Sequence, residues 1–352
     1  MIPHDAKKPI DLRKKNLSQK MLSSDLYNVI AVTTAPMPKE NPDTILDTLG
    51  KERLYLQYEG ELAYLRGDFA RTICCFRKTV GDDAARLRAC PVAIAAAISL
   101  GDYSIYMEIV SYLKRFTQTG IEDDISAFAE LALSTAAVSV IAPNMVPHWI
   151  REGEFSALPI QARPNAIYLR AKYFQCISRY EESLAVAQTA LTLCTSEETI
   201  TMTDIYLLVT CTVACCYLGR LEEARHWLIE AMSIALPHGF ITPFSEIVAA
   251  IGGLMEQCLE IEFPHYRDIV ITQWKYVWRN WITFHNRFTN DNITLILTLR
   301  EYHIALLAAQ HVPYVKIAKQ YGISVGRLKN IMLGIYEKLF ISGREELSQF
   351  VF

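Results

Sequence analysis

The spacing of apolar residues is the feature that most constrains the fold of this 352-residue chain. From about Lys51 onward, apolar residues recur at helical spacing, and the strict alternation that marks a half-buried β-strand is scarce. The prolines fall between these periodic segments, at positions 91, 143, 147, 159, 164, 237, 243 and 264. Because proline interrupts helical hydrogen bonding, this placement is typical of a protein built from helices alone. The sequence therefore predicts an all-α fold.

Composition agrees with a packed chain, since 51% of the residues are hydrophobic and 21% are charged. That balance is too apolar for a disordered chain. The nine cysteines include no Cys-x-x-Cys pair, so we expect reduced, buried thiols in a cytosolic compartment. No apolar run is long enough to span a bilayer, and the N-terminus lacks the apolar core of a secretory signal. The chain is expected to be cytoplasmic, without a membrane partner, a metal or a cofactor.

Four segments share one pattern, in which an apolar helix is followed by a small residue, one spacer, a large apolar residue and a second apolar helix. The small residues are Gly67, Gly101, Ser178 and Gly219, and the large residues that open the second helix are Phe69, Tyr103, Tyr180 and Leu221. Small residues at these positions can take the left-handed conformation that ends a helix. Each segment predicts a helical hairpin that stacks on its neighbours to bury its apolar face.

The third and fourth segments resemble tetratricopeptide-like repeats in their small-x-aromatic-x-x-small turns. The spacing is irregular, with 34 residues from Gly67 to Gly101 and 41 from Ser178 to Gly219. The resemblance covers roughly residues 51–239, and it implies a helical-repeat solenoid whose concave surface receives a small molecule, peptide or protein. We therefore assign residues 51–263 to a sensor or interaction domain, preceded by a partly flexible segment at 1–50 with one short helix near residues 24–32.

A stripe of aromatic residues follows, with Trp274, Trp281 and Phe288 seven positions apart and Trp278 in the adjacent row. This spacing predicts one long amphipathic helix, which we treat as a connector at residues 264–292. Its aromatic face has three interpretations: a cap that closes the solenoid, a dimer interface, or the wall of a ligand site.

The last segment predicts a helix-turn-helix. Thr298 and Glu301 form a capping box for a helix that runs through Ala309. Pro313 begins a second, short helix that ends at Gly322, and Ser324 is a good N-cap for a third. A fourth helix is expected to begin at Arg344. Two short helices, a glycine turn and a longer helix are the parts of a helix-turn-helix.

Over residues 297–347 the chain resembles the LuxR-type (GerE) DNA-binding domain. The matching residues are Leu297, Thr298, Arg300, Glu301, Ile317, Ala318, Ile323, Ser324, Leu328, Lys329, Ile335, Tyr336, Lys338, Leu339 and Arg344. The departures are His311 for the usual glycine, Lys316 for glutamate, Arg327 for threonine, Ile331 for histidine, and Leu333 and Gly334 for polar residues.

The resemblance implies that residues 293–352 form a four-helix DNA-binding domain whose third helix enters the major groove. Arg327, Lys329 and Asn330 can hydrogen-bond base edges, and in the family the positions matching Lys329, Asn330 and Leu333 commonly face bases. Leu333 would either contact a thymine methyl group or lie under protein. The phosphate backbone would be held by Ser324 with the free amides of the helix start, and by Lys316 and Lys319.

The charge distribution along the chain agrees with an anionic partner for the C-terminal segment. Residues 295–352 contain seven Lys and Arg against four Asp and Glu, a balance of +3, which leaves −6 for residues 1–294 of a chain with net charge −3. We expect a bacterial transcriptional regulator that binds double-stranded DNA as a homodimer. The alternative is a helical-repeat adaptor whose altered helix-turn-helix no longer binds DNA. Common catalytic motifs are absent from the sequence, so no enzyme is expected.

Overall fold

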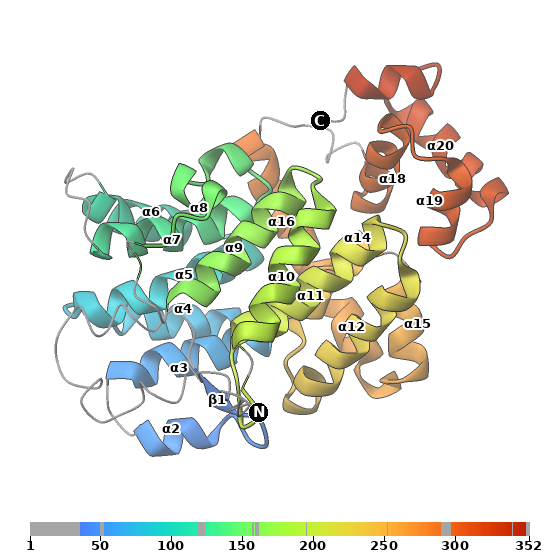
Figure 1. The fold of residues 1–352 in the computed structure, drawn as a ribbon. Helices are drawn as coiled ribbons and strands as arrows, with labels where there is room; N and C mark the ends of the chain where they lie inside the picture. Colours follow the sequence, from blue (N-terminus) through green and yellow to red (C-terminus); the bar gives the residue numbers. More distant parts are fainter. Residues whose placement is uncertain are drawn as a thin grey trace, which may run out of the picture.

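The computed structural model of the chain describes residues 36–49, 53–117, 124–156, 158, 162–194, 196–251, 253–289, 297–339 and 341–349. Over these residues the fold is predominantly helical, which confirms the predicted all-α class (Figure 1). The short helix expected near residues 24–32 lies outside the described residues. We call residues 36–289 the body and residues 297–349 the C-terminal unit.

The helices of the body are α2 (Thr44–Leu49), α3 (Arg53–Leu65), α4 (Phe69–Arg77), α5 (Asp83–Leu100), α6 (Tyr103–Thr117), α7 (Asp124–Ser139), α8 (His148–Glu152), α9 (Arg163–Cys176), α10 (Tyr180–Cys194), α11 (Met202–Tyr217), α12 (Leu221–Ala235), α13 (Thr242–Ser245), α14 (Val248–Ile251), α15 (Gly253–Ile261) and α16 (Arg267–Thr289). The C-terminal unit contains α18 (Leu299–Ala309), α19 (Tyr314–Gln320) and α20 (Val325–Leu339). Single 3₁₀ turns lie at Pro143–Met145, Leu236–His238 and Pro264–Tyr266, and a longer 3₁₀ helix at Arg344–Gln349.

The four predicted hairpins are packed helix pairs: α3 with α4, α5 with α6, α9 with α10 and α11 with α12. The second helix of each pair begins at the predicted residue. The residues that end the first helices all have a positive φ, namely Gly67, Gly101, Ser178 and Gly219. Each donates its amide to the carbonyl three residues earlier, as in the link from Gly101 to Ile98 at 3.0 Å. A left-handed residue thus closes each first helix, as the pattern predicted.

Two details of the helices differ from the sequence-based expectation. Pro91 lies inside α5, where burial of Cys90 and Val92 keeps the helix continuous although proline donates no amide hydrogen bond. The fourth C-terminal element is a 3₁₀ helix at Arg344–Gln349 rather than an α-helix, and it is only six residues long.

Two very short strands, β1 (Met37–Pro38) and β2 (Thr199–Ile200), pair antiparallel, although no strand was expected. They join segments about 160 residues apart, a pairing that local alternation of apolar residues does not reveal. Met37 is completely buried, so the core of the body includes residues before position 51.

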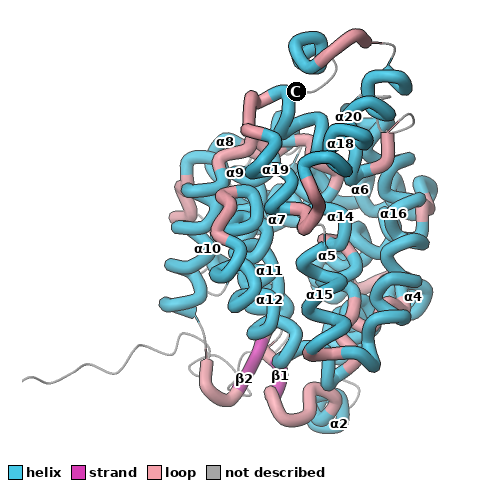
Figure 2. The backbone as a smooth tube through the Cα atoms, turned by 90° about the vertical axis from the view of Figure 1, so that its right-hand side faces the viewer, coloured by secondary structure: helices cyan, strands magenta, loops and turns pink. Residues whose placement is uncertain are grey.

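The buried residues of the described chain form separate clusters. The largest runs through the helix pairs of the body, from Met37 to Phe284, and a smaller one lies beneath α7 to α9. The C-terminal unit has its own cluster, which includes Ile304, Ile317 and Ile335. Figures 1 and 2 both show this unit at the end of the molecule opposite α2 and the two strands.

Helix α16 packs across the body against α5 and α13. Its polar side chains bond to carbonyl groups at the ends of other helices: Asn280 Nδ2 donates to Ser99 O at 2.8 Å, and Trp281 Nε1 donates to Ser139 O at 2.6 Å. Carbonyls in the last turn of a helix have no partner within that helix, so these bonds satisfy them while fixing the position of α16.

Candidate functional site

The turn between α19 and α20 has the local structure that the sequence predicted. Gly322 has a φ of 62°, and the Ile323 amide donates to the Ala318 carbonyl at 3.0 Å, which ends α19. The Ser324 hydroxyl then accepts the Arg327 amide at 3.2 Å. Ser324 is therefore the N-cap of α20, since its side chain satisfies one of the free amides at the start of that helix.

Helix α20 has one buried face and one exposed face. Leu328, Met332 and Ile335 are at most 1% exposed and pack in the core of the C-terminal unit. The opposite face is exposed and presents the predicted base-reading residues, which are Arg327, Lys329, Asn330 and Leu333. Leu333 is 58% exposed, so no part of the described body covers this face.

The two lysines predicted to contact phosphates lie on the neighbouring helix. Lys316 and Lys319 of α19 are exposed, whereas Ile317 and Ala318 between them are buried. Among the described residues, no carboxylate pairs with either lysine. Arg327 and Lys329 of α20 are likewise without an acidic partner in the described chain. Four basic side chains and one amide therefore share one exposed surface of two adjacent helices.

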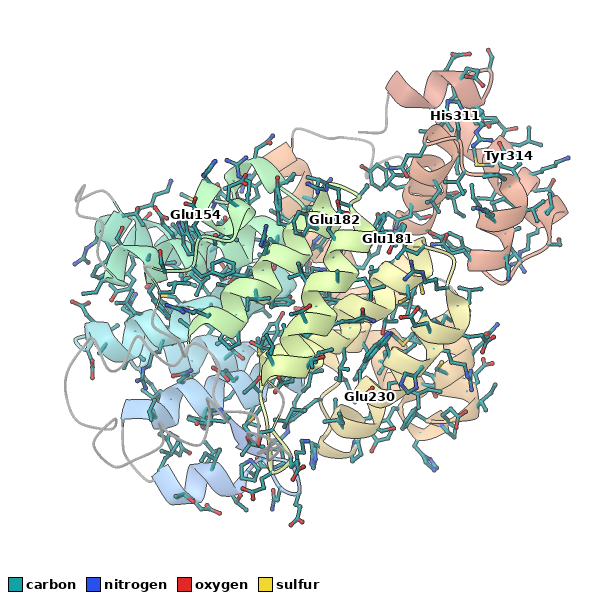
Figure 3. All side chains as sticks on the ribbon, viewed as in Figure 1. Glu154, Glu181, Glu182, Glu230, His311 and Tyr314 are labelled. Atoms are coloured by element: carbon teal, nitrogen blue, oxygen red, sulfur yellow. The ribbon has the colours of Figure 1, made fainter. Side chains whose placement is uncertain are left out.

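Two other residues, Arg344 and Tyr336, hold the C-terminal unit together. Arg344 donates to the carbonyls of Ala308 at 2.7 Å and Val312 at 2.9 Å, so it satisfies acceptors at the end of α18. The Tyr336 hydroxyl bonds that of Tyr314 at 2.9 Å. His311, labelled with Tyr314 in Figure 3, has a φ of 60° at the turn after α18. It thus takes the left-handed conformation although it is not glycine.

The capping box at the start of α18 is also present. The Glu301 amide donates to the Thr298 hydroxyl at 3.2 Å, and the Thr298 amide donates to the Glu301 carboxylate at 2.8 Å. Both bonds join groups that a bare helix start leaves unpaired.

A cavity of about 210 Å³ lies among the helices of the body and reaches His303 of the C-terminal unit. It is lined by the first helices of the pairs, by α7, and by the face of α16 that carries Trp274, Trp278 and Trp281. The indole rings of Trp278 and Trp281 stack with centroids 5.1 Å apart. The aromatic face of α16 therefore lies against a cavity of the chain.

The polar side of the cavity contains one carboxylate held by tyrosines. Glu246, which directly follows α13, accepts a hydrogen bond from the Tyr64 hydroxyl and another from the Tyr206 hydroxyl at 2.8 Å. Burial raises the pKa of Glu246, while the tyrosine hydroxyls and the Lys172 charge act against that rise.

Lys172 of α9 also lines the cavity. Its ammonium donates to Gln175 Oε1 at 3.0 Å, and Gln175 Nε2 in turn donates to the Thr210 carbonyl at 2.9 Å. Burial lowers the pKa of Lys172. Titratable groups with pKa values shifted by burial beside a cavity are typical of functional sites.

The sequence analysis missed Lys172 and Glu246. The available signal was a lone charged residue in an apolar stretch, as Glu246 has in PFSEIVAAI. That signal does not predict which residues contact Glu246, because the groups around the cavity come from helices far apart in the sequence.

The C-terminal unit touches the body next to the cavity. The Tyr217 hydroxyl of α11 and His303 Nδ1 of α18 are joined by a hydrogen bond of 2.7 Å. The Tyr217 ring stacks on Tyr180 with centroids 4.4 Å apart and planes 7° from parallel. His303 is 8% exposed and also lines the cavity, so the cavity reaches the first helix of the C-terminal unit.

Within the described parts of the chain, no group of His, Cys, Asp and Glu side chains is placed to hold a metal ion. The same parts contain no helix with the length and apolar character needed to cross a bilayer. Comparison of the chain with protein-family models, curated proteins and solved structures yields no match.

Proposed function

We propose that the protein is a DNA-binding transcriptional regulator whose C-terminal unit is a LuxR-type helix-turn-helix. Helix α20 enters the major groove, where Arg327, Lys329 and Asn330 donate to base edges. Lys316 and Lys319 of α19 hold the phosphate backbone and position the unit without reading sequence.

The observation that supports this proposal is the exposed face of α20. The base-reading side chains are accessible, and the apolar residues of the helix are all used on the other side. In an adaptor that had lost DNA binding, nothing would keep this face free of its own body. Leu333 is 58% exposed next to the basic side chains, and we propose that it contacts a thymine methyl group.

The charge distribution supports the same assignment. Residues 295–352 carry a net charge of +3, whereas residues 1–294 carry a net charge of −6. An acidic body is repelled by DNA phosphates, so binding is directed to the C-terminal unit. A single module buries little surface and binds modestly, and we therefore propose that two copies bind adjacent half-sites.

We further propose that the body is a tetratricopeptide-like sensor domain. Its left-handed turns, paired helices and interior cavity are the features that support this role. The contact between Tyr217 and His303 gives the sensor a physical connection to the DNA-binding unit.

Electrophoretic mobility shift with genomic fragments of the source organism tests the proposal. At low salt, the full chain should shift a subset of fragments, and the double variant Arg327→Ala, Lys329→Ala should bind them at least about tenfold more weakly, because each bidentate base contact contributes about 1–3 kcal/mol. A control variant, Lys78→Ala with Lys275→Ala, removes two exposed charges from the body and should bind like the unmodified chain. Equal binding by all three proteins would refute the assignment.

A further inference from the structure

We propose that the cavity binds a small organic acid, whose apolar part lies against Trp274, Trp278 and Trp281 and whose carboxylate accepts hydrogen bonds from Lys172. The inference deepens the sensor role in the proposed function by naming the chemical class of the effector.

The size and lining of the cavity set the first limit on the ligand. An apolar cavity of about 150 Å³ in a protein core already admits benzene. At about 210 Å³, this cavity admits a molecule with one ring and a short polar substituent. The tryptophan wall favours a flat or aliphatic apolar part, because ligand sites combine apolar walls with a few placed polar groups.

Lys172 supplies the polar group. Its ammonium has three N–H donors, and within the described chain its hydrogen bond is to a neutral amide, Gln175 Oε1. No carboxylate of the described chain hydrogen-bonds it. Lys172 is half-buried, and partial removal of a charge from water costs free energy unless an opposite charge lies beside it. A ligand carboxylate would add a directly bonded partner through charge-assisted hydrogen bonds.

The carboxylate of Glu246 attracts the Lys172 charge, but no hydrogen bond joins the two side chains in the described chain. One of its oxygens accepts the Tyr64 hydroxyl and the other accepts the Tyr206 hydroxyl at 2.8 Å. The aromatic rings and Glu246 could instead attract a cationic ligand, since cations bind over indole faces. The two tyrosine hydroxyls already satisfy Glu246, however. Trp274 Nε1 and Asn165 Oδ1, which also line the cavity, have no hydrogen-bond partner in the described chain. The cavity therefore offers a ligand two donors, at Lys172 and Trp274, and one acceptor, at Asn165, and a carboxylate fits the two donors.

The position of the cavity gives the ligand a route to the C-terminal unit. His303 lines the cavity and bonds to Tyr217, which lies at the contact between the body and α18. A ligand that reaches the His303 side of the cavity would therefore contact a residue that joins the two units.

Three probes with the same ring and different charge test the class of ligand: phenylacetate, phenylacetamide and phenethylamine. Each is titrated into the full chain without DNA, with calorimetry and tryptophan fluorescence as readouts, since three of the five tryptophans line the cavity. Phenylacetate should bind, and the neutral amide should bind about tenfold more weakly, the loss expected for one charge-assisted hydrogen bond. Phenethylamine should not bind.

Lys172→Met keeps the length of the side chain and removes its charge, so it should weaken phenylacetate binding about tenfold with the fold intact by circular dichroism. Lys275→Met, an exposed lysine on α16, is the matched control and should bind phenylacetate normally. Binding of phenethylamine as tight as that of phenylacetate, an unchanged Lys172→Met variant, or no binding of any probe at millimolar concentration would overturn the inference. Because no DNA is present, failure here is distinct from failure of the DNA-binding proposal.

Discussion

Two half-buried ionisable residues of the cavity are stabilised in different ways. Glu246 has two tyrosine hydroxyls as donors, whereas Lys172 has one neutral amide acceptor in the described chain. The first arrangement is complete without a ligand and holds α13 against α3 and α11. The second leaves donors unused. At the scale of single residues, we therefore assign Glu246 a structural role and propose a binding role for Lys172.

The raised pKa of Glu246 predicts how the free energy of unfolding depends on pH. Folding favours the protonated carboxyl, so this contribution to stability is complete below the ordinary pKa near 4.5 and is lost as the pH rises through the raised value. Glu246→Gln stays neutral at every pH. The free energy of unfolding of the Gln variant, relative to the unmodified chain, should therefore increase from near pH 4.5 to about pH 8, well above ordinary carboxyl pKa values.

Urea denaturation of both proteins at the two pH values measures this difference, and comparing the pair cancels the titration of all other groups. A difference in unfolding free energy that does not change with pH would show that Glu246 is ionised as readily in the folded state as in the unfolded chain.

Single residues also show where sequence patterns are sufficient. Ser178 was assigned to a helix-ending turn because of its position in the repeat pattern, and its φ of 60° confirms that assignment although it is not glycine. His311 was noted as a departure at a glycine position, and it has the same conformation. The pattern of surrounding apolar residues specifies the turn, and glycine only lowers its cost.

At the scale of elements, α16 depends on turns of the helix pairs. A Cβ atom added at Gly101 would lie 3.0 Å from Asn280 Oδ1 and 3.3 Å from Asn280 Cβ, so glycine there permits the close approach of α16. Gly219 has the same left-handed backbone, with φ values of 73° and 74° at the two positions, but nothing lies within 4 Å of its added Cβ. Comparing substitutions at the two glycines therefore separates the cost of the left-handed backbone from the cost of disturbing the packing of α16.

Gly219→Ala should cost about 1 kcal/mol of stability, the cost of a left-handed conformation for a residue with a Cβ atom. Gly101→Ala should cost about 2 kcal/mol, because it also disturbs the bond from Asn280 to Ser99, and one hydrogen bond contributes about 1 kcal/mol. Chemical denaturation measures both. Equal losses in the two variants would mean that α16 can shift away from Gly101 at no cost.

Element boundaries were predictable where one local signal decides them. The capping box at Thr298 and the N-cap at Ser324 have the expected hydrogen bonds. Pro91 was misjudged because core packing on both sides of it outweighs the local signal of proline. The pairing of β1 with β2 was missed because it depends on two segments brought together by the rest of the fold.

At the scale of the whole molecule, α16 packs against α5 and α13 and leaves a cavity beside its tryptophans. The sequence predicted the aromatic helix but left its partner open. Three alternatives remained because an aromatic stripe indicates that one face of the helix is covered but not whether the same chain, a second copy or a ligand covers it. The cavity could not be predicted, since its lining residues extend from Glu61 to His303 along the chain.

The proposed DNA-binding surface contains residues that read the base sequence and residues that bind phosphates. Substitutions in the two sets should change DNA affinity in different ways. Fluorescence anisotropy compares a duplex selected from the shifted genomic fragments with a scrambled duplex over a range of salt concentrations. Lys329→Ala with Asn330→Ala should lower the affinity ratio between the two duplexes about tenfold or more, because these side chains read base edges. Lys316→Ala with Lys319→Ala should weaken both duplexes equally and reduce the slope of log affinity against log salt by about 2, since two phosphate contacts are lost. If the Lys329 and Asn330 variant keeps the affinity ratio of the unmodified chain, α20 does not read the major groove and the central proposal is wrong.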